Sequence, residues 1–205
     1  MLSRRTLLSG AAGTAAISTP AITVAAIPTP RQAAGPFFPD VLPPESDADL
    51  TQIGSGAAAQ GEVIEVAGRV LGLDGRPISG AAVQLWQANT FGRYANTRDR
   101  SSAPLDPNFQ GYGVAMSDAE GFYRFRTIRP GLYTGRTRHL HFAAQGPGFE
   151  VFTTQMYFEG EPDNGADFLY RSLGDRAGAL TTRFALDAER GVPVGTFDFV
   201  VDGRG

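Results

Sequence analysis

The only two histidines of this 205-residue chain, His139 and His141, flank a single leucine. Side chains alternate between the two faces of a β-strand, so a strand here would project both imidazoles from one face, roughly 6.5–7 Å apart. One metal ion could bind both. A pair of histidines on a sheet face can also be an ordinary polar patch, so the pair alone does not establish a metal site.

The composition restricts what such a metal could be. The chain has no cysteine, which excludes iron–sulfur clusters, type-1 copper and cysteine-ligated zinc. It also has no lysine, which excludes Schiff-base chemistry and a P-loop. The remaining ligands would be oxygens from tyrosine, aspartate, glutamate, the backbone or water. We therefore expect a mixed nitrogen and oxygen site.

Two of the six tyrosines occupy suggestive places in the sequence. Tyr133 follows a Pro-Gly turn shortly before His139, so a short loop could fold it back toward the imidazoles. Tyr94 comes just after the predicted strand over 82–87. Each tyrosine also has a simple structural interpretation, in which the ring packs against its neighbours and the hydroxyl makes a hydrogen bond.

From Glu62 onward the chain has the pattern of a β protein. Short segments rich in aromatic and β-branched residues alternate with turn signals such as Asp74-Gly75. They predict strands over 63–71, 82–87, 121–127, 139–144, 152–158 and 196–201. Only two short helices are predicted, over 167–173 and 178–186. The sequence therefore predicts an all-β fold, a β-sandwich with a prealbumin-like core, long loops and few short helices.

Residues 1–26 have the layout of a twin-arginine export signal. Arg4 and Arg5 precede an uncharged stretch rich in alanine, glycine and threonine. The stretch is too weakly apolar for a membrane-spanning helix, so no stable membrane anchor is expected. We expect residues 27–61 to form an N-terminal arm and residues 62–205 to form the sandwich domain. The expected location of the protein is periplasmic or extracellular.

The overall charge argues against one class of partner. The formal net charge is −3, and the arginines are spread along the chain rather than gathered in one region. Nucleic acid is therefore not an expected partner. The sequence leaves open whether the chain forms a homo-oligomer.

Several motifs follow one another in a fixed order. They are Thr29 to Pro39, Pro104 to Gly111, Ser117 to Tyr133, Gly135 to Phe142, and Thr154 to Pro162. Together they resemble the intradiol ring-cleavage dioxygenases, and within that family the iron-bearing subunit of the protocatechuate 3,4-dioxygenases. The likeness spans about residues 29–162 and, more loosely, the last predicted strand.

The resemblance implies a function and a set of site residues. A member of this family is a non-haem Fe(III) enzyme that uses O2 to cleave a catechol-type ring between its two hydroxyl-bearing carbons, giving a cis,cis-muconate. The family's iron ligands fall on Tyr94, Tyr133, His139 and His141. Arg136 matches the arginine that stabilises negative charge on the substrate ring, and Gln155 matches a polar residue of the substrate pocket. We expect Tyr133 to leave the iron when substrate binds, and Tyr94 to stay.

The charge of such a site is consistent with burial. Free phenols have a pKa near ~10, yet a trivalent cation can displace their protons, as bound metals do for water and thiols. Two phenolates and one hydroxide would then cancel the charge of Fe(III). A neutral site is what a buried, apolar environment favours.

The chain departs from the family pattern at the loop before the histidines. The interval from Tyr133 to His139 is much shorter than in protocatechuate or catechol dioxygenases, and Gly135 stands where the family usually has a tryptophan. These differences predict a more open pocket. They leave undecided whether the substrate is catechol, protocatechuate, hydroxyquinol or a bulkier phenol.

Two alternatives from other classes remain open. The stretches 68–85 and 117–123 also match prealbumin-like sandwich modules of secreted binding and adhesion proteins, so the chain could be an exported binding module without catalysis. Such a module has no reason to contain the four-ligand set. A cupin-type metal enzyme would need a glutamate soon after the second histidine, where Ala144 and Gln145 stand.

Overall fold

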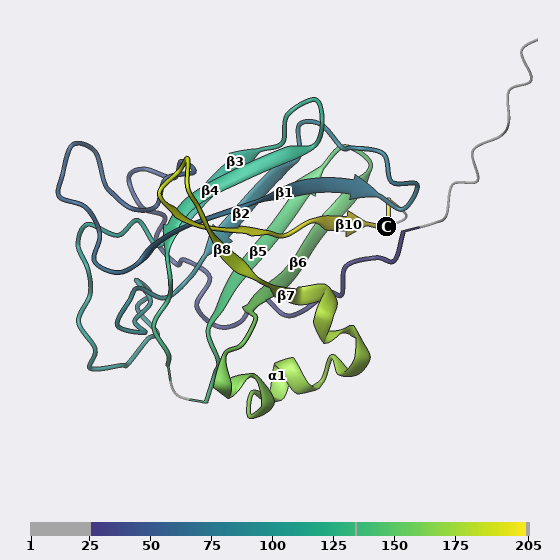
Figure 1. The fold of residues 1–205 in the computed structure, drawn as a ribbon. Coiled ribbons are helices and arrows are strands. Elements are labelled where there is room, and N and C mark those ends of the chain that lie inside the picture. The colour runs from purple at the N-terminus through teal and green to yellow at the C-terminus, as the bar shows by residue number, and fades with distance from the viewer. Residues whose placement is uncertain (1–25, 134, 204–205) are drawn as a thin grey trace, which may run out of the picture.

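Two five-stranded sheets make up the fold, which confirms the predicted β-sandwich (Figure 1). The computed structural model describes residues 26–133 and 135–203. The strands are β1 (Val63–Gly72), β2 (Ala82–Trp86), β3 (Tyr112–Met116), β4 (Phe122–Ile128), β5 (His139–Gly146), β6 (Phe149–Phe158), β7 (Thr181–Thr182), β8 (Phe184–Asp187), β9 (Val192–Thr196) and β10 (Phe199–Val201). The helices are α1 (Phe168–Arg171) and two 3-10 turns, Pro162–Gly165 and Gly174–Leu180.

In the first sheet, β1 is the central strand. It pairs antiparallel with β4 along one side and parallel with β9 and then β10 along the other. Between β9 and β10 the carboxylate of Asp198 accepts the backbone N–H of Arg69 at 2.8 Å and interrupts the ladder. Gly68 permits this approach, because a Cβ there would lie 1.9 Å from the carbonyl oxygen of Phe197. The prediction of one continuous strand over 196–201 is therefore wrong at its centre.

The second sheet has the order β3-β2-β5-β6-β7 and presents the two histidines. Its strand β5 pairs antiparallel with β2 on one side and with β6 on the other. Along β5, Leu140 and Phe142 belong to the core between the sheets. Because side chains alternate along a strand, His139 and His141 point to the opposite, outer face of this sheet.

Two groups of buried apolar side chains stabilise the structure. The main core lies between the sheets, where for example the rings of Phe142 and Phe199 lie 5.5 Å apart. A smaller group, which we call the outer-face cluster, contains Trp86, Ala88, Tyr94, Tyr112 and Ala143. The histidines of β5 therefore lie beside a second small core and not at a bare surface.

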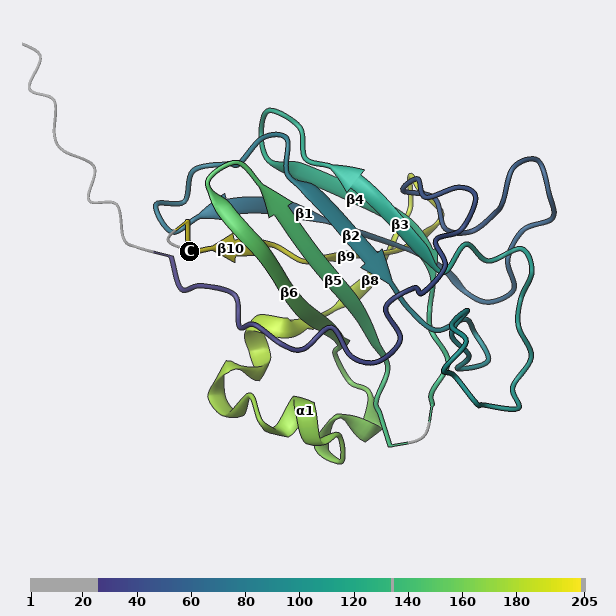
Figure 2. The same ribbon diagram turned by 180° about the vertical axis from the view of Figure 1, so that it is seen from behind.

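The segment that leads into β1 covers this outer face (Figure 2). The backbone N–H of Gln32 donates to the carbonyl of Thr153 on β6 at 3.0 Å, and the Gln155 side chain donates to the carbonyl of Ala33 at 3.0 Å. Further along, Ala34 and Phe37 pack against the outer-face cluster. The predicted arm thus supplies the outer wall of the histidine region.

The predicted export signal, residues 1–26, lies outside the described residues except for Ala26. The amide of Ala26 donates to the carbonyl of Leu73 at 2.9 Å. Within residues 26–133 and 135–203, no helix has the length and apolar character needed to cross a membrane.

The helix predictions are half right. Helix α1 lies inside the predicted 167–173, and Asp167 caps it by accepting the N–H groups of Leu169 and Tyr170. The predicted helix over 178–186 is wrong, because a 3-10 turn ends at Leu180 and strands β7 and β8 follow. Here β7 pairs with β6 and the ring of Phe184 stacks on Phe158, so tertiary contacts decide the local structure.

Candidate active site

The two histidines of β5 bring their ring nitrogens together. Nε2 of His139 lies 3.2 Å from Nε2 of His141, and also 3.2 Å from the hydroxyl oxygen of Tyr133. Two ligand atoms that bind one ion at about 2.1 Å, roughly at a right angle, lie about 3 Å apart. The three donor atoms therefore have the separation that a single metal ion requires.

Hydrogen bonding and packing orient both imidazoles. Nδ1 of His139 lies 2.7 Å from the carbonyl oxygen of Thr137, so Nδ1 carries the proton and Nε2 keeps its lone pair for a metal. The His141 ring stacks on Trp86, with centroids 5.1 Å apart and planes at 9°. On the arm, Gly35 adopts φ +74°, and a Cβ there would lie only 3.2 Å from Cε1 of His141.

Both imidazoles are neutral near pH 7. Burial and the neighbouring positive charge of Arg136 lower the pKa of His139 to about 3. Burial, His139 and Arg136 lower the pKa of His141 well below its usual value of 6.5. A neutral imidazole is the form that binds metal ions, so neither histidine has to lose a proton before it binds one.

The structure brings Tyr94 to the same place from a distant loop. Its ring lies 5.5 Å from that of Tyr133 and 6.1 Å from that of His141. Among the described residues, no group makes a hydrogen bond of good geometry to its hydroxyl, although Tyr94 is only 3% exposed. The Tyr133 hydroxyl lies near enough to help raise the pKa of Tyr94. A buried polar atom without a partner costs about 1–3 kcal/mol, so this orphaned oxygen calls for a ligand.

The chemistry of the donor set agrees with a cation that takes tyrosine oxygens. Across the part of the chain that the structure describes, no three His, Cys, Asp or Glu side chains gather in a way that could hold a metal. Burial raises the pKa of Tyr94 well above 10 and also raises that of Tyr133, so both phenols are protonated without a metal. The four predicted ligands therefore fit a trivalent ion that can displace phenol protons.

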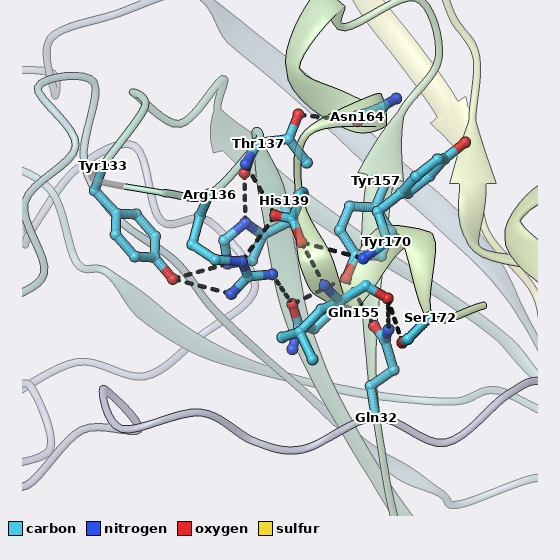
Figure 3. A network of polar contacts seen from close by, with 12 residues as sticks. Gln32, Tyr133, Arg136, Thr137, His139, Gln155, Tyr157, Asn164, Tyr170 and Ser172 are labelled. Atoms are coloured by element: carbon cyan, nitrogen blue, oxygen red, sulfur yellow. Dashed lines mark hydrogen bonds and ion pairs between the residues drawn. The ribbon is translucent and has the colours of Figure 1, made fainter. Parts of the chain in front are cut away.

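Arg136 occupies a fixed position beside Tyr133 and His139 (Figure 3). Its Nη1 lies 3.2 Å from the Tyr133 hydroxyl, and its Nη2 donates to Oε1 of Gln155 at 2.7 Å. Its Nε donates to Asp167 at 2.8 Å. A tight turn makes this possible, because the amide of Arg136 donates to the carbonyl of Tyr133. The guanidinium is thus held over the donor atoms by three side chains.

Gln155 lies behind the guanidinium. It is fully buried on β6, directly opposite His141 in the strand register. Its Oε1 accepts hydrogen bonds from Arg136 and, at 3.3 Å, from the hydroxyl of Tyr157. In this structure its role is to hold Arg136 in place.

Asp167 belongs to the site, although its sequence context does not indicate this. Its carboxylate is completely buried, and it accepts hydrogen bonds from both Arg136 and the backbone N–H of Thr137. The available signal was a helix-capping one, because Asp is a preferred residue just before a helix and 167–173 was predicted as helix. That signal reveals the cap and gives no indication of the contact with Arg136.

A pocket of about 940 Å³ opens beside the four predicted ligands. Tyr133 and Arg136 form part of its wall, while His139 and His141 are nearly fully buried behind them. Tyr94 is not part of this wall either. A small molecule that enters the pocket therefore meets the Tyr133 hydroxyl and the guanidinium first.

Comparisons with known proteins agree on one family. A sequence model of the family described as "Dioxygenase" matches residues 33–203. The protocatechuate 3,4-dioxygenase beta chain of Burkholderia cepacia is 44% identical over 155 residues, which cover 70% of this chain and 66% of that protein. The 6-chlorohydroxyquinol 1,2-dioxygenase of Cupriavidus pinatubonensis is 33% identical over 166 residues, covering 70% and 55%. The chain thus spans about half to two thirds of the length of these curated relatives.

Solved structures share the fold. The dioxygenase domain of a dioxygenase and carbohydrate-binding protein fusion from Streptomyces sp. SirexAA-E has a TM-score of 0.68 at 38% identity, covering 86% of this chain and 99% of that chain. The intradiol ring-cleavage dioxygenase from Tetranychus urticae has a TM-score of 0.71 at 18% identity, covering 88% and 97%.

The sandwich and its site define a dioxygenase-type scaffold, in which two histidines and two tyrosines meet on the outer face of one sheet. The chain belongs to the intradiol ring-cleavage dioxygenase family. The alternative of a binding module without catalysis is not favoured.

Proposed function

We propose that the protein cleaves a catechol-type ring between its two hydroxyl-bearing carbons, with O2 as the other substrate. The carbon–carbon bond and the O–O bond break, and each of the two carbons becomes a carboxyl group of a cis,cis-muconate. Both oxygen atoms enter the product, so the reaction needs no external reductant. The names of the relatives support this chemistry, since protocatechuate and a chlorinated hydroxyquinol appear in them.

One observation carries the proposal. Three donor atoms, from Tyr133, His139 and His141, converge at 3.2 Å separations, and the buried hydroxyl of Tyr94 beside them lacks a partner within the described ranges. A structural tyrosine would have its hydroxyl paired. These four residues would hold Fe(III), whose chemistry when bound is to withdraw electron density from a chelated catecholate and so prepare its ring for O2.

The two tyrosines have different surroundings, which suggests different roles. Tyr94 is buried in the outer-face cluster, and its backbone N–H donates to the buried carboxylate of Asp99 at 2.8 Å. Tyr133 faces the open pocket, and its hydroxyl already contacts Arg136. We therefore propose that Tyr133, whose phenol would be ionised with the metal bound, takes up a proton from the incoming catechol at its oxygen and swings aside, while Tyr94 remains in place.

Arg136 supplies a fixed positive charge at the pocket wall. Its side chain is only 10% exposed, and the contacts with Asp167 and Gln155 prevent it from turning away. A preorganised cation stabilises negative charge that develops on a bound ring without any reorganisation at the moment of reaction. Its planar, forked donors suit this better than a flexible ammonium would.

We also propose that residues 1–26 direct export by the twin-arginine route to the periplasm or beyond. The paired Arg4 and Arg5 and the uncharged stretch after them support it. Cell fractionation of the intact chain and of an Arg4→Gln, Arg5→Gln variant checks it. Retention of the variant inside the cell supports the route, and equal export of both contradicts it.

The visible absorption spectrum tests the enzymatic proposal. The purified protein loaded with iron should show a broad tyrosinate-to-Fe(III) charge-transfer band, which shifts to longer wavelength when catechol is added without oxygen. Admission of O2 should then yield a muconate and consume one O2 per catechol. A protein that stays colourless after iron loading would overturn the proposal.

A further inference from the structure

Two large apolar side chains stand exposed beside Tyr133. Phe91 is 38% exposed and Leu132 is 44% exposed, and both line the 940 Å³ pocket. Exposed apolar side chains of this size are ordinary when scattered singly over a surface, but here they form a pair at one functional opening. We call this pair the apolar rim.

The apolar rim is a built structure. The loop of Phe91 and the loop of Leu132 pack backbone against backbone, since a Cβ on Gly92 would lie 2.0 Å from the carbonyl oxygen of Leu132. Across the same contact, a Cβ on Gly131 would lie 2.3 Å from the amide nitrogen of Gly92. The carbonyl of Asn89 accepts the N–H groups of both glycines, at 3.0 and 2.8 Å. The two loops thus hold the rim in one position.

Polar groups form other parts of the pocket wall. The side chains of Arg100 and Ser102 are exposed, and they line the pocket together with Ser101. Hydroxyls and a guanidinium offer hydrogen bonds to a ligand that extends beyond the rim. The pocket therefore presents an apolar surface next to Tyr133, while Arg100, the two serines and three aspartates make much of the remaining wall polar.

The size of the pocket exceeds what a simple catechol needs. Pockets of about 300–1,000 Å³ hold drug-sized molecules, and 940 Å³ lies near the top of that range. A single ring held against Tyr133 and Arg136 would leave the apolar rim in contact with water. Leaving so much apolar surface wet loses binding free energy that a larger ligand would recover.

We propose that the substrate is a catechol that bears a second aromatic ring, with the second ring packed on Phe91 and Leu132. This proposal rests on the proposed ring cleavage and names its substrate class. The catechol oxygens face Tyr133 and Arg136, the second ring covers the apolar rim, and hydroxyl substituents on it reach Ser101 and Ser102. Substitution opposite the reacting carbons leaves the cleavage step itself unchanged.

The ratio of kcat/KM for 4-phenylcatechol to kcat/KM for catechol tests the proposal. For the iron-loaded protein we expect a ratio above about ten, since a well-filled apolar pocket discriminates by 10-fold or more. In the double variant Phe91→Ala, Leu132→Ala the ratio should fall about tenfold. Leu186→Ala serves as the control, because Leu186 is an exposed leucine on β8 of the other sheet and is not part of the pocket wall. Its ratio should stay at the wild-type value.

Three outcomes are decisive. If the double variant keeps the wild-type ratio, the apolar rim does not bind substrate and the proposal is wrong. The proposal is equally wrong if that variant changes only self-association in ultracentrifugation, because the rim would then be a protein contact. If the wild type cleaves neither compound, the ring-cleavage proposal fails. Equilibrium binding of 4-phenylcatechol then tests the apolar rim separately. The double variant should bind this compound about tenfold more weakly than the wild type does.

Discussion

The carboxylate of Asp167 lies 2.8 Å from Nε of Arg136, and the same oxygen accepts the backbone N–H of Thr137 at 2.9 Å. The carbonyl of Thr137 in turn accepts the Nδ1 proton of His139. One buried carboxylate therefore positions the guanidinium and, through one residue, an imidazole. Although burial raises the pKa of Asp167, hydrogen bonds from Arg136, Tyr170 and Thr137 hold it below its ordinary value, so the group is charged at neutral pH.

Replacing this carboxylate should impair the reaction more than the fold. We expect Asp167→Asn to lower kcat/KM about ten- to hundredfold, the usual effect of losing a group that orients active-site residues. The loss should fall mainly on kcat, because Arg136 would no longer be held over the ring. Asp118→Asn is the control for the loss of a carboxylate that caps a turn, since the exposed Asp118 accepts two backbone N–H groups in a distant turn. Steady-state kinetics of both variants measure the effect. Comparable losses of kcat/KM in the two variants would refute the role of Asp167 in positioning Arg136.

Removing the Tyr94 hydroxyl should separate metal binding from stability. In metal-free protein Tyr94→Phe deletes a buried oxygen that lacks a partner among the described residues, so the free energy of unfolding should stay the same or rise by about 1 kcal/mol. Iron binding should weaken strongly. Tyr123→Phe is the contrast, because its hydroxyl donates to the carbonyl of Phe197, and it should lose about 1 kcal/mol while still binding iron. Urea denaturation measures the free energy of unfolding, and iron titration measures iron binding. If Tyr94→Phe lowered the free energy of unfolding, the Tyr94 hydroxyl would have a structural partner.

Tyr133 should affect turnover more than folding. Its hydroxyl contacts Arg136 and His139, each at 3.2 Å, at the wall of an open pocket. Without it, the incoming catechol loses a proton acceptor, so Tyr133→Phe should lower kcat about 10²-fold, a typical loss for a missing general base. Pre-steady-state absorbance should show slower catechol chelation as well. Unchanged chelation kinetics would mean that the protons go elsewhere.

The arm should help to position the His141 ring through the close approach of Gly35 to Cε1 of His141. Gly35→Ala places a methyl group 3.2 Å from Cε1 of His141 and forces alanine into φ +74°. Gly80→Ala carries the same backbone cost of about 1–2 kcal/mol at φ +72°, with nothing within 4 Å of the new Cβ. We expect similar losses of stability in both variants and weaker iron binding only in Gly35→Ala. Equal iron affinities would show that the arm does not position His141.

The sequence predicts the structure correctly where the alternation of side chains within a single strand is enough to decide it. The alternation around His139 and His141 is a property of β5 alone, and the structure places both rings on one face, as expected. The interruption at Asp198 could not be predicted in this way, because it depends on Gly68 in another strand. The same holds for 178–186, where pairing with β6 overrides local preference.

The residues of the candidate site also differ in how far the sequence predicts them. Tyr94 was found through family motifs, since nothing local relates it to His141, which is far along the chain. Asp167 was missed because its contact with Arg136 spans 31 positions and leaves no periodic trace. Gln32, whose side chain accepts from the Tyr157 hydroxyl, was missed for the same reason. Contacts between distant segments need the folded structure to be seen.

The parallel pairing of β1 with β9 and β10 determines when the protein can finish folding. Val70 pairs with Phe199, so β1 waits for a strand that is synthesised much later. Pairings of such long sequence separation slow folding, because the loop must close before the contact forms. The sheet that carries the histidines is complete by β7, which ends at Thr182. A nascent chain can therefore assemble the ligand sheet against β1 and β4, where the ring of Phe125 lies 6.2 Å from that of Phe142. The part of the inner face that Phe199 covers stays exposed until β10 pairs with β1.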